Sequence, residues 1–458
     1  MLSPMTGQSR EGQMAKVAQM TNRSKAGRYG HLVRADGLVH RSLFTDADLF
    51  REEMVKIFGG SWVFLLHEAE IPAPHDFKTL TIGLRPVIVS RRTDGEIVAL
   101  LNRCPHRGSM VCSETSGNSP RFQCPYHGWT FTSDGDLYAI PYHQGYPETY
   151  DKTKRGLGRF PRVEVYRGFV FGCLNPEVES VVDWLGPARE VFDWCIDREN
   201  IGPRGVSVAR GMTMVYGGNW KLQNDNNGDM YHAPVTHRST ADMNMNRHGP
   251  GKTLDHFKRD ANPMLAKYFG HGHKLLDQRP AIDSPWLRAR PIPGREVAGG
   301  AVEQRHDSEQ ARTLLDLTGR SGINLVLYPN LLLMGHGTFA VYEPLAVDRT
   351  NVRYYTALIN DAPDEINTLR IRFSEDFNNV AARDDNEIFE RIQTALDHSP
   401  EMPWLDFSKG LGTNREHFAA DGSVTGNISD ETGIRGSYEW WRQLMNSDVK
   451  TSLVGVEQ

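Results

Sequence analysis

The sequence predicts an α+β protein in which a small all-β domain precedes a larger domain with an antiparallel sheet covered by helices. Between residues 61 and 173, short runs of Val, Ile, Leu and aromatic residues alternate with Gly, Pro and Asp, a pattern typical of a small β domain. After residue 175, similar runs are joined by connections too short for crossover helices, which favours antiparallel pairing. The predicted units are an N-terminal arm at 1–44, the small domain with a lead-in helix at 45–175, and the larger domain at 176–458.

Composition excludes several classes of protein. The chain has 458 residues, 39% of them hydrophobic, which is enough for two or three domains with substantial cores. Its 52 basic and 57 acidic side chains are interspersed and give a net charge of -5, so we expect neither nucleic acid nor a membrane as a partner. Without a secretory signal or an apolar run of membrane-spanning length, a cytoplasmic protein is expected. Five cysteines in such a chain indicate metal binding or burial rather than disulfides.

The first half of the chain is predicted to contain one helix and then strands. The polar segment before residue 44 suggests an arm. Residues 44–58 have helical periodicity, with Thr45 or Asp46 as the N-cap and Gly59-Gly60 at the end. The clearest strand-like runs that follow are 62–66, 86–89, 97–101 and 168–172.

The second half mixes the two kinds of element. Residues 184–195 have helical periodicity and 206–216 are strand-like, whereas 245–320 are polar and irregular. One or two helices are expected over 364–396, and a short last helix over 436–445. Four further strands are predicted at 323–328, 331–334, 338–342 and 352–359.

Two loops of the small domain each contain one Cys and one His. Cys104 and His106 are separated by one residue, and Cys124 and His127 by two. In a Rieske-type [2Fe-2S] centre, two Cys hold one iron and two His hold the other. A structural zinc site uses the same residue types, but it usually takes a pair of Cys and then a pair of His. The mixed order therefore favours the cluster, and the other cysteines are expected to be buried small hydrophobes: Cys112, Cys173 and Cys195.

A second group of potential metal ligands lies further along the chain. His232 and His237 follow a segment rich in amides and acids, and Pro234 is expected to bend the chain so that both rings converge. Two imidazoles and a carboxylate form the facial triad of Fe(II) oxygenases. The candidate carboxylate belongs to the pair Asp384-Asp385 in a helical pattern. Alone, such an acidic pair is typical of a solvated helix face, so the hypothesis depends on the combination.

Together, these motifs resemble the alpha subunits of Rieske non-haem iron aromatic-ring-hydroxylating oxygenases, from about Phe44 to the segment 430–441. The resemblance implies that the iron is held by His232, His237 and Asp385. It also implies that Asp229 bridges hydrogen bonds between a metal-binding His and a cluster-binding His of the neighbouring subunit. Asp225 is a further candidate catalytic residue, and it is a departure because many relatives have Glu followed by Asn or Gln at 224–225. The family's cluster motif matches Cys104, His106, Cys124 and His127.

The resemblance implies the terminal oxygenase component of a multicomponent dioxygenase. Such an enzyme hydroxylates an aromatic ring with O₂ and with electrons from NAD(P)H, which arrive through a reductase or ferredoxin. The segments 219–223 and 430–441 are similar to the branch that acts on benzoate-like or anthranilate-like acids. An Arg or His from 245–320 or 323–377 is therefore expected to pair with the substrate carboxylate. The family also implies a homotrimer of alpha subunits, with or without three beta subunits.

Three alternatives remain open at this point. One is a Rieske monooxygenase that hydroxylates a ring or removes alkyl groups from O or N. Another is a Rieske electron carrier without oxygenase activity, although a carrier needs neither the motif at 228–237 nor the long region after residue 175. The third is a non-catalytic zinc-stabilised binding module, which the second group of ligands argues against.

Overall fold

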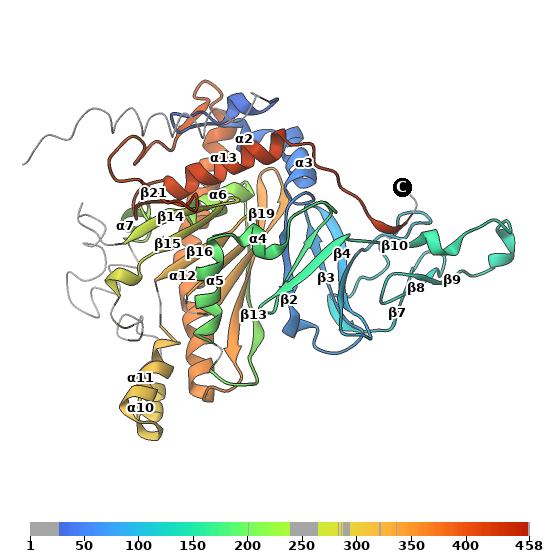
Figure 1. Cartoon of the computed structure of the whole chain (residues 1–458), viewed down its shortest axis with the longest axis horizontal. Coiled ribbons are helices and arrows are strands. Elements are labelled where there is room, and N and C mark those ends of the chain that lie inside the picture. Colours follow the sequence, from blue (N-terminus) through green and yellow to red (C-terminus); the bar gives the residue numbers. More distant parts are fainter. Residues whose placement is uncertain are drawn as a thin grey trace, which may run out of the picture.

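The computed structural model describes residues 27–199, 201–238, 264–282, 284, 286, 294–319, 322–335 and 337–456. Among these residues, a six-stranded and a nine-stranded sheet are the two largest. Figure 1 shows the β-rich unit at one side of the molecule and the large sheet, with long helices against it, at the other. This arrangement confirms the predicted α+β class.

The small unit is built on antiparallel strands. Its six-stranded sheet has the order β23-β10-β5-β4-β3-β6, and two three-stranded sheets have the orders β7-β8-β9 and β11-β12-β2. Strand β23, close to the C-terminus, pairs with β10, so the end of the chain is part of the first unit. The bounds are β2 Val63–His67, β3 Asp76–Ile82, β4 Arg85–Arg91, β5 Ile97–Leu101, β6 Ser116–Asn118, β7 Arg121–Gln123, β8 Thr130–Thr132, β9 Leu137–Ala139, β10 Arg155–Arg159, β11 Arg162–Tyr166, β12 Phe169–Cys173 and β23 Val454–Val456.

The large sheet has the order β13-β19-β18-β17-β16-β15-β14-β22-β21, and all of its pairs are antiparallel, as expected. A separate two-stranded sheet pairs β1 (Leu38–His40) with β20 (Trp404–Asp406). The strand bounds are β13 Val206–Tyr216, β14 Leu265–Gly270, β15 His273–Asp277, β16 Ile323–Leu327, β17 Leu331–Met334, β18 Thr338–Ala346, β19 Arg349–Ile359, β21 His417–Phe418 and β22 Val424–Asn427.

One expectation for the large unit was wrong in part. The segment 245–320, predicted to be irregular, contains β14, β15 and two helices, α10 (Arg295–Arg305) and α11 (Ser308–Asp316). Every residue of β15 is buried, including His273, Lys274 and Asp277, so the strand shows neither polar alternation nor an apolar run. Residues 245–263 and 287–293 of this segment lie outside the described residues.

The predicted helices occur with shifted boundaries. Helix α3 (Ala47–Lys56) is capped by the Asp46 carboxylate, which accepts hydrogen bonds from the backbone N–H groups of Asp48 and Leu49. A separate turn, α2 (Ser42–Thr45), precedes it. The predicted helix at 184–195 is divided at Gly186-Pro187 into α4 (Val181–Leu185) and α5 (Ala188–Asp197). The last two helices are longer than predicted: α12 spans Asp364–His398 without a break, and α13 spans Thr432–Asn446.

A buried carboxylate joins three helices behind the site described below. Glu53 on α3 is fully buried and accepts hydrogen bonds from Lys221 Nζ at 2.7 and 2.8 Å. The indole N–H groups of Trp220 and Trp441 donate to the same carboxylate at 2.9 and 2.7 Å. Since Trp220 and Lys221 belong to α6 (Trp220–Asn226) and Trp441 to α13, this group fixes the helix that leads into the second metal motif.

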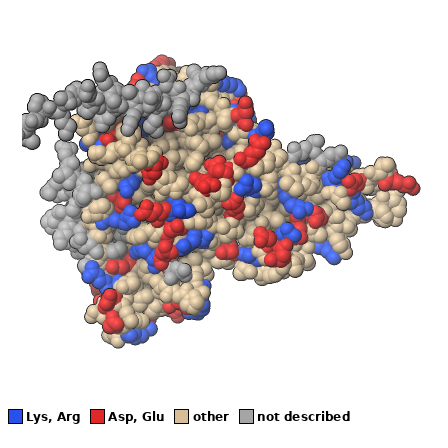
Figure 2. Space-filling view, in the orientation of Figure 1, with Lys and Arg blue, Asp and Glu red and all other residues tan. Residues whose placement is uncertain are grey.

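The distribution of charge on the surface and the character of the helices can be compared with the composition. Figure 2 shows acidic and basic side chains interspersed over the visible face, with no basic stripe among the described residues there. In the described parts of the chain, no helix combines the length and the apolar character that crossing a membrane requires.

Candidate cluster site and iron site

The two Cys–His loops have the same backbone design. The N–H of Cys104 donates to Ser109 O at 2.8 Å, and the N–H of Gly108 returns to Cys104 O at 2.9 Å. In the second loop, Cys124 N donates to Trp129 O at 2.8 Å and Gly128 N to Cys124 O at 3.1 Å. Both glycines have positive φ, 79° and 71°, which only glycine adopts without strain. Each loop therefore turns tightly around its own cysteine.

The ligand atoms of these loops form two pairs. The Cys104 and Cys124 side chains are close enough that Cys124 raises the pKa of Cys104, and both residues are only 2% exposed. The His106 and His127 rings are partly exposed, and their centroids lie 4.5 Å apart. His106 also stacks on Trp129 at 5.1 Å, and its Nδ1 is buried without a hydrogen-bond partner. Burial raises the pKa of the Cys104 thiol to about 11, so a thiolate there requires the charge of a metal.

This geometry distinguishes a two-iron cluster from zinc. Two ligand atoms on one zinc ion lie no further apart than the sum of two bond lengths, roughly 4.6 Å. No three of the four residues bring ligand atoms within 4.8 Å of one another. Thiol paired with thiol, and imidazole with imidazole, instead matches a cluster in which each pair holds its own iron. The unpartnered His106 Nδ1 fits the same assignment.

The second motif brings three donors together. His232 and His237 flank the short helix α7 (Ala233–Thr236), with Pro234 in its first turn, and Asp385 projects from α12. Asp385 Oδ1 lies 3.6 Å from His232 Nε2 and 3.2 Å from His237 Nε2. Among the described residues, this is the group of three or more potential ligands whose donor atoms lie within 4.8 Å of one another. The two rings converge, as expected, but the expected bend at Pro234 is not seen: Pro234 lies in the first turn of α7, where proline is compatible with a helix.

The donor set fits a divalent iron. Asp385 Oδ1 is buried and has no hydrogen-bond partner, although the two imidazoles face it. Burial raises the pKa of Asp385, while the neighbouring rings of His237 and His232 lower it. Burial also lowers the pKa of His237. Two nitrogen donors and one carboxylate with an open side are the ligands that non-haem Fe(II) takes.

Two further carboxylates orient the imidazoles. Asp229 Oδ2 lies 3.1 Å from His232 Nδ1, and Asp384 Oδ2 lies 3.4 Å from His237 Nδ1. A carboxylate at Nδ1 fixes the tautomer and leaves Nε2 for the metal. Asp229 was singled out from the sequence, but this role of Asp384 was not. The only signal for it was that the two acids are adjacent in the sequence.

Asp225 has a different environment from the three donors. It is on α6, where its carboxylate accepts a hydrogen bond from the Tyr438 hydroxyl of α13. Burial raises the pKa of Asp225 to about 6, against the opposing charge of Lys274. The described hydrogen bond of the Asp225 carboxylate is therefore with α13, and not with the three donors. A direct catalytic role for Asp225 stays a prediction.

The expected partner for a substrate carboxylate is not identified among the described residues. Three arginines of the predicted regions already pair with carboxylates: Arg279 with Asp277, Arg353 with Glu343, and Arg370 with Glu199. Residues 239–263 and 287–293 lie outside the described residues.

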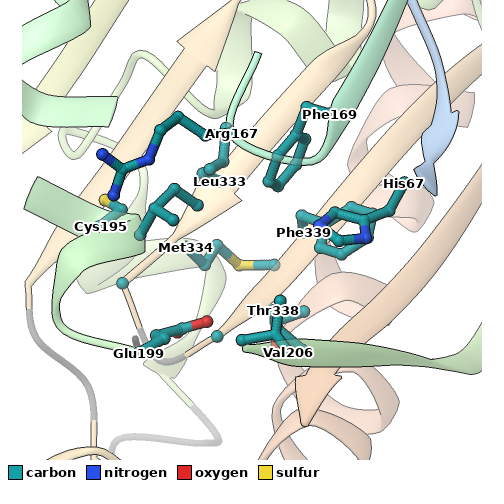
Figure 3. A pocket seen from close by; sticks show the side chains of 14 residues that line it. His67, Arg167, Phe169, Cys195, Glu199, Val206, Leu333, Met334, Thr338 and Phe339 are labelled. Atoms are coloured by element: carbon teal, nitrogen blue, oxygen red, sulfur yellow. The ribbon is translucent and has the colours of Figure 1, made fainter. Parts of the chain in front are cut away.

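A small cavity between α5, β12 and β18 is not the substrate site. Figure 3 shows Phe169, Met334 and Phe339 around it, with Glu199 at one edge. Its volume is ≈30 Å³, room for roughly two water molecules, and no iron ligand lines it. An aromatic substrate therefore needs another space.

Comparison with known proteins identifies the domains. Residues 61–158 match the Rieske [2Fe-2S] domain, and residues 203–447 match the ring hydroxylating alpha subunit (catalytic domain). The toluate 1,2-dioxygenase subunit alpha of Pseudomonas putida is 35% identical over 438 residues, covering 90% of this chain and 91% of the relative. The 2-halobenzoate 1,2-dioxygenase large subunit of Burkholderia cepacia is 35% identical over 383 residues, covering 81% and 79%.

A solved structure supports the same conclusion. Naphthalene 1,2-dioxygenase with indole bound in the active site superposes with a TM-score of 0.73 at 28% identity, covering 93% of this chain and 94% of that chain. A Rieske domain joined to a catalytic domain with two His and one carboxylate defines the class of Rieske non-haem iron oxygenases. The chain belongs to the family of ring-hydroxylating alpha subunits within that class.

Proposed function

We propose that this chain is the terminal oxygenase component of a multicomponent dioxygenase that hydroxylates the ring of an aromatic carboxylic acid. The observation that carries the proposal is the convergence of His232, His237 and Asp385, with Asp385 Oδ1 buried and unpartnered. An isolated electron carrier has no use for such a group. The substrate class is supported by two relatives of 35% identity, which are named for toluate and 2-halobenzoate, both ring carboxylates.

The proposed ligands divide by chemistry. Fe(II) is held by His232, His237 and Asp385, and the [2Fe-2S] cluster by Cys104, His106, Cys124 and His127. When bound, the iron supplies a site for O₂ beside the ring. The chain's own contribution is orientation: Asp229 and Asp384 hold the Nδ1 atoms of the two imidazoles, so that both Nε2 atoms stay directed at Asp385.

We further propose that the working unit is a ring-shaped trimer of this chain, with or without three beta subunits. In Figure 1, the strands β7 and β8 that carry the second cluster loop lie at the end of the molecule opposite α7. Within one chain, the proposed cluster ligands and the proposed iron ligands therefore lie far apart. In the trimer, Asp229 links His232 to a cluster-binding His of the next subunit, and a reductase or ferredoxin delivers electrons from NAD(P)H.

The division into an arm at 1–44, a Rieske unit at 45–175 and a catalytic unit at 176–458 is part of the same proposal, except that β23 near the C-terminus pairs with β10 of the Rieske unit. So is a cytoplasmic location, where NAD(P)H is available and where thiols stay reduced. All five cysteines are free and buried, in keeping with that compartment.

The test uses the purified holoenzyme with a surrogate reductase, NADH and a panel of aromatic acids and amines under ¹⁸O₂. We expect substrate-dependent NADH oxidation with the acids and two ¹⁸O atoms in a ring diol. One ¹⁸O atom in the product would identify a monooxygenase instead. Zinc without acid-labile sulfide would overturn the proposal.

Variants locate the reaction. Asp385→Ala is expected to abolish turnover and to leave the visible spectrum of the cluster unchanged, because the cluster ligands belong to the other unit. Glu387→Gln is the matched control, since Glu387 is an exposed acid on the same helix that pairs with Arg391. Turnover that survives Asp385→Ala would place the active site elsewhere.

A further inference from the structure

A lysine outside both metal motifs contacts the segment that contains Asp229 and His232. Lys409 lies in the connection between β20 and β21, far from that segment in sequence. Its ammonium Nζ is 4.1 Å from the centroid of the Tyr231 ring. Tyr231 is 58% exposed, so few other groups restrain its ring. A cation over an aromatic face is attracted by the negative face of the ring.

The ammonium itself is held in place. Its Nζ donates hydrogen bonds to Ser429 O at 2.6 Å and to Ser429 Oγ at 2.9 Å. Because an ammonium has three N–H donors, these two bonds leave one for the side on which Tyr231 lies. Lys409 is therefore fixed between a backbone carbonyl, a hydroxyl and the ring.

The backbone of Lys409 is equally restrained. Lys409 N donates to Glu431 Oε2 at 3.2 Å, and Glu431 N donates to Lys409 O at 3.1 Å. Arg435 Nη1, on α13, donates to the same carbonyl at 2.7 Å. The backbone of Lys409 is therefore attached by hydrogen bonds to the first turn of α13, whereas the backbone and side chain of a solvated surface lysine are less restrained.

Tyr231 transmits this restraint to the iron site. Its backbone N–H donates to Asp229 Oδ1, while Asp229 Oδ2 lies 3.1 Å from His232 Nδ1. Lys409, Tyr231, Asp229 and His232 therefore form one continuous series of contacts. A shift of Tyr231 changes the position of the carboxylate that orients the metal-binding imidazole.

We propose that Lys409 is a positioning residue of the iron site, which acts through Tyr231 to hold Asp229 against His232. The inference rests on the proposed function, because Lys409 is proposed to act on the iron site described there. Lys409 itself belongs to neither of the two metal motifs. Lys409 contacts Tyr231, Ser429, Glu431 and Arg435, none of which is a proposed iron ligand. Its effect is on the orientation of His232 and, through Asp229, on electron delivery to the iron.

The test compares Lys409→Met, which keeps the stem and removes the charge, with Lys409→Arg, which keeps a cation above the ring. Both holoenzymes are first shown to contain wild-type iron and cluster per chain. We expect the Fe(II)–nitric oxide EPR signal of Lys409→Met to differ in line shape from wild type. Single-turnover oxidation of its reduced cluster by O₂ and substrate should slow by about tenfold, the lower range for residues behind a metal ligand. Lys409→Arg should restore both readouts.

Three further variants keep the proposal falsifiable. Tyr231→Leu should reproduce the effects of Lys409→Met, and the double variant should be no slower than either single one, because both remove the same contact. Lys450→Met, at an exposed lysine paired with Glu177, is the control and should match wild type.

The outcomes separate this inference from the proposed function. Wild-type nitric oxide signal and cluster oxidation in Lys409→Met would overturn the positioning role alone. Equal impairment of the Met and Arg variants at wild-type iron content would also overturn it, because a cation above the Tyr231 ring would then make no difference. A wild-type enzyme without any Fe(II)–nitric oxide signal would overturn both proposals.

Discussion

His273 has no exposed surface, and both of its ring nitrogens have partners. Nε2 lies 3.0 Å from Trp184 O, and the backbone N–H of Tyr328 donates to Nδ1 at 3.1 Å. Since a backbone N–H can only donate and a carbonyl can only accept, the proton must be on Nε2 and the ring must be neutral. A second proton on Nδ1 would face the N–H of Tyr328. Burial, with a contribution from His271, lowers the pKa of His273 to about 3.

This imidazole makes stability depend on pH in a defined window. The unfolded chain takes up a proton near pH 6.5, whereas the folded protein does so only near pH 3, so the unfolded state binds more protons in between. Stability therefore falls as pH drops below about 6.5. At pH 5.5, His273 alone should lower the unfolding free energy by about 1.4 kcal/mol relative to pH 7.5.

Calorimetric melting of His273→Gln at pH 7.5 and 5.5 checks this prediction. The variant should melt earlier than wild type at both values, but its difference in Tm between the two should be smaller. His143→Gln, at an exposed position, should keep the wild-type difference. An unchanged difference in His273→Gln would show that other groups cause the pH dependence.

At the scale of elements, regular patterns were enough to place β13 and β17, whose bounds agree with the predicted ranges. Strands with mixed chemistry were missed. In β15, Lys274 is buried but satisfied by Asn224 Oδ1 at 2.5 Å and Ser437 Oγ at 3.1 Å, which are partners from distant elements. Periodicity reports which face is solvated, so it cannot reveal a polar residue whose partner comes from tertiary packing. For the same reason, it did not indicate that β23 joins the first unit.

The Glu53 group gives a prediction at this scale, because one carboxylate joins α3, α6 and α13. Burial lowers the pKa of Lys221, and Glu53 opposes that shift. Glu53→Gln leaves the Lys221 ammonium buried without its counter-charge, a change that typically costs about 3–5 kcal/mol. We expect a correspondingly large loss of Tm, with the cluster spectrum still present at low temperature.

The double variant Glu53→Gln/Lys221→Met separates charge from packing. It removes both buried charges, so it should recover part of the stability that the single variant loses. Thermal unfolding followed by circular dichroism measures this. A double variant less stable than Glu53→Gln would mean that the indole hydrogen bonds, rather than the ion pair, dominate the junction.

For the whole molecule, sequence was sufficient to name the three residues that the fold brings together, His232, His237 and Asp385, but not the geometry around them. His237 and Asp384 are 147 residues apart, and only the fold of α7 against α12 brings them within 3.4 Å. The residue types could be expected from the chemistry of iron, but the choice of Asp385 came from the resemblance to the family, since an acidic pair alone is typical of a solvated helix face. Asp384 and Lys409 each act through a side-chain contact with a distant element. Such a contact produces no periodic pattern in the sequence, so it could not be predicted.

The largest-scale prediction concerns how the two metal sites cooperate. If the cluster of one subunit serves the iron of the next, an enzyme without cluster and an enzyme without iron should complement each other. His127→Ala and Asp385→Ala chains with different tags can be coexpressed, and doubly tagged hybrids can be purified. Each hybrid ring of three contains one junction with both an intact cluster and an intact iron site, so activity should reach about one third of wild type.

Transfer within a chain predicts the opposite result, because no hybrid chain contains both centres. The two homogeneous variants are the controls, and both should be inactive. Analysis of iron and acid-labile sulfide in the hybrids must show that each centre is present in its expected proportion. Fully loaded hybrids without activity would then contradict transfer across the subunit boundary. Because β7 and β8, which flank the second Cys–His loop, and α7, which lies between His232 and His237, are at opposite ends of one chain, we expect the hybrids to be active.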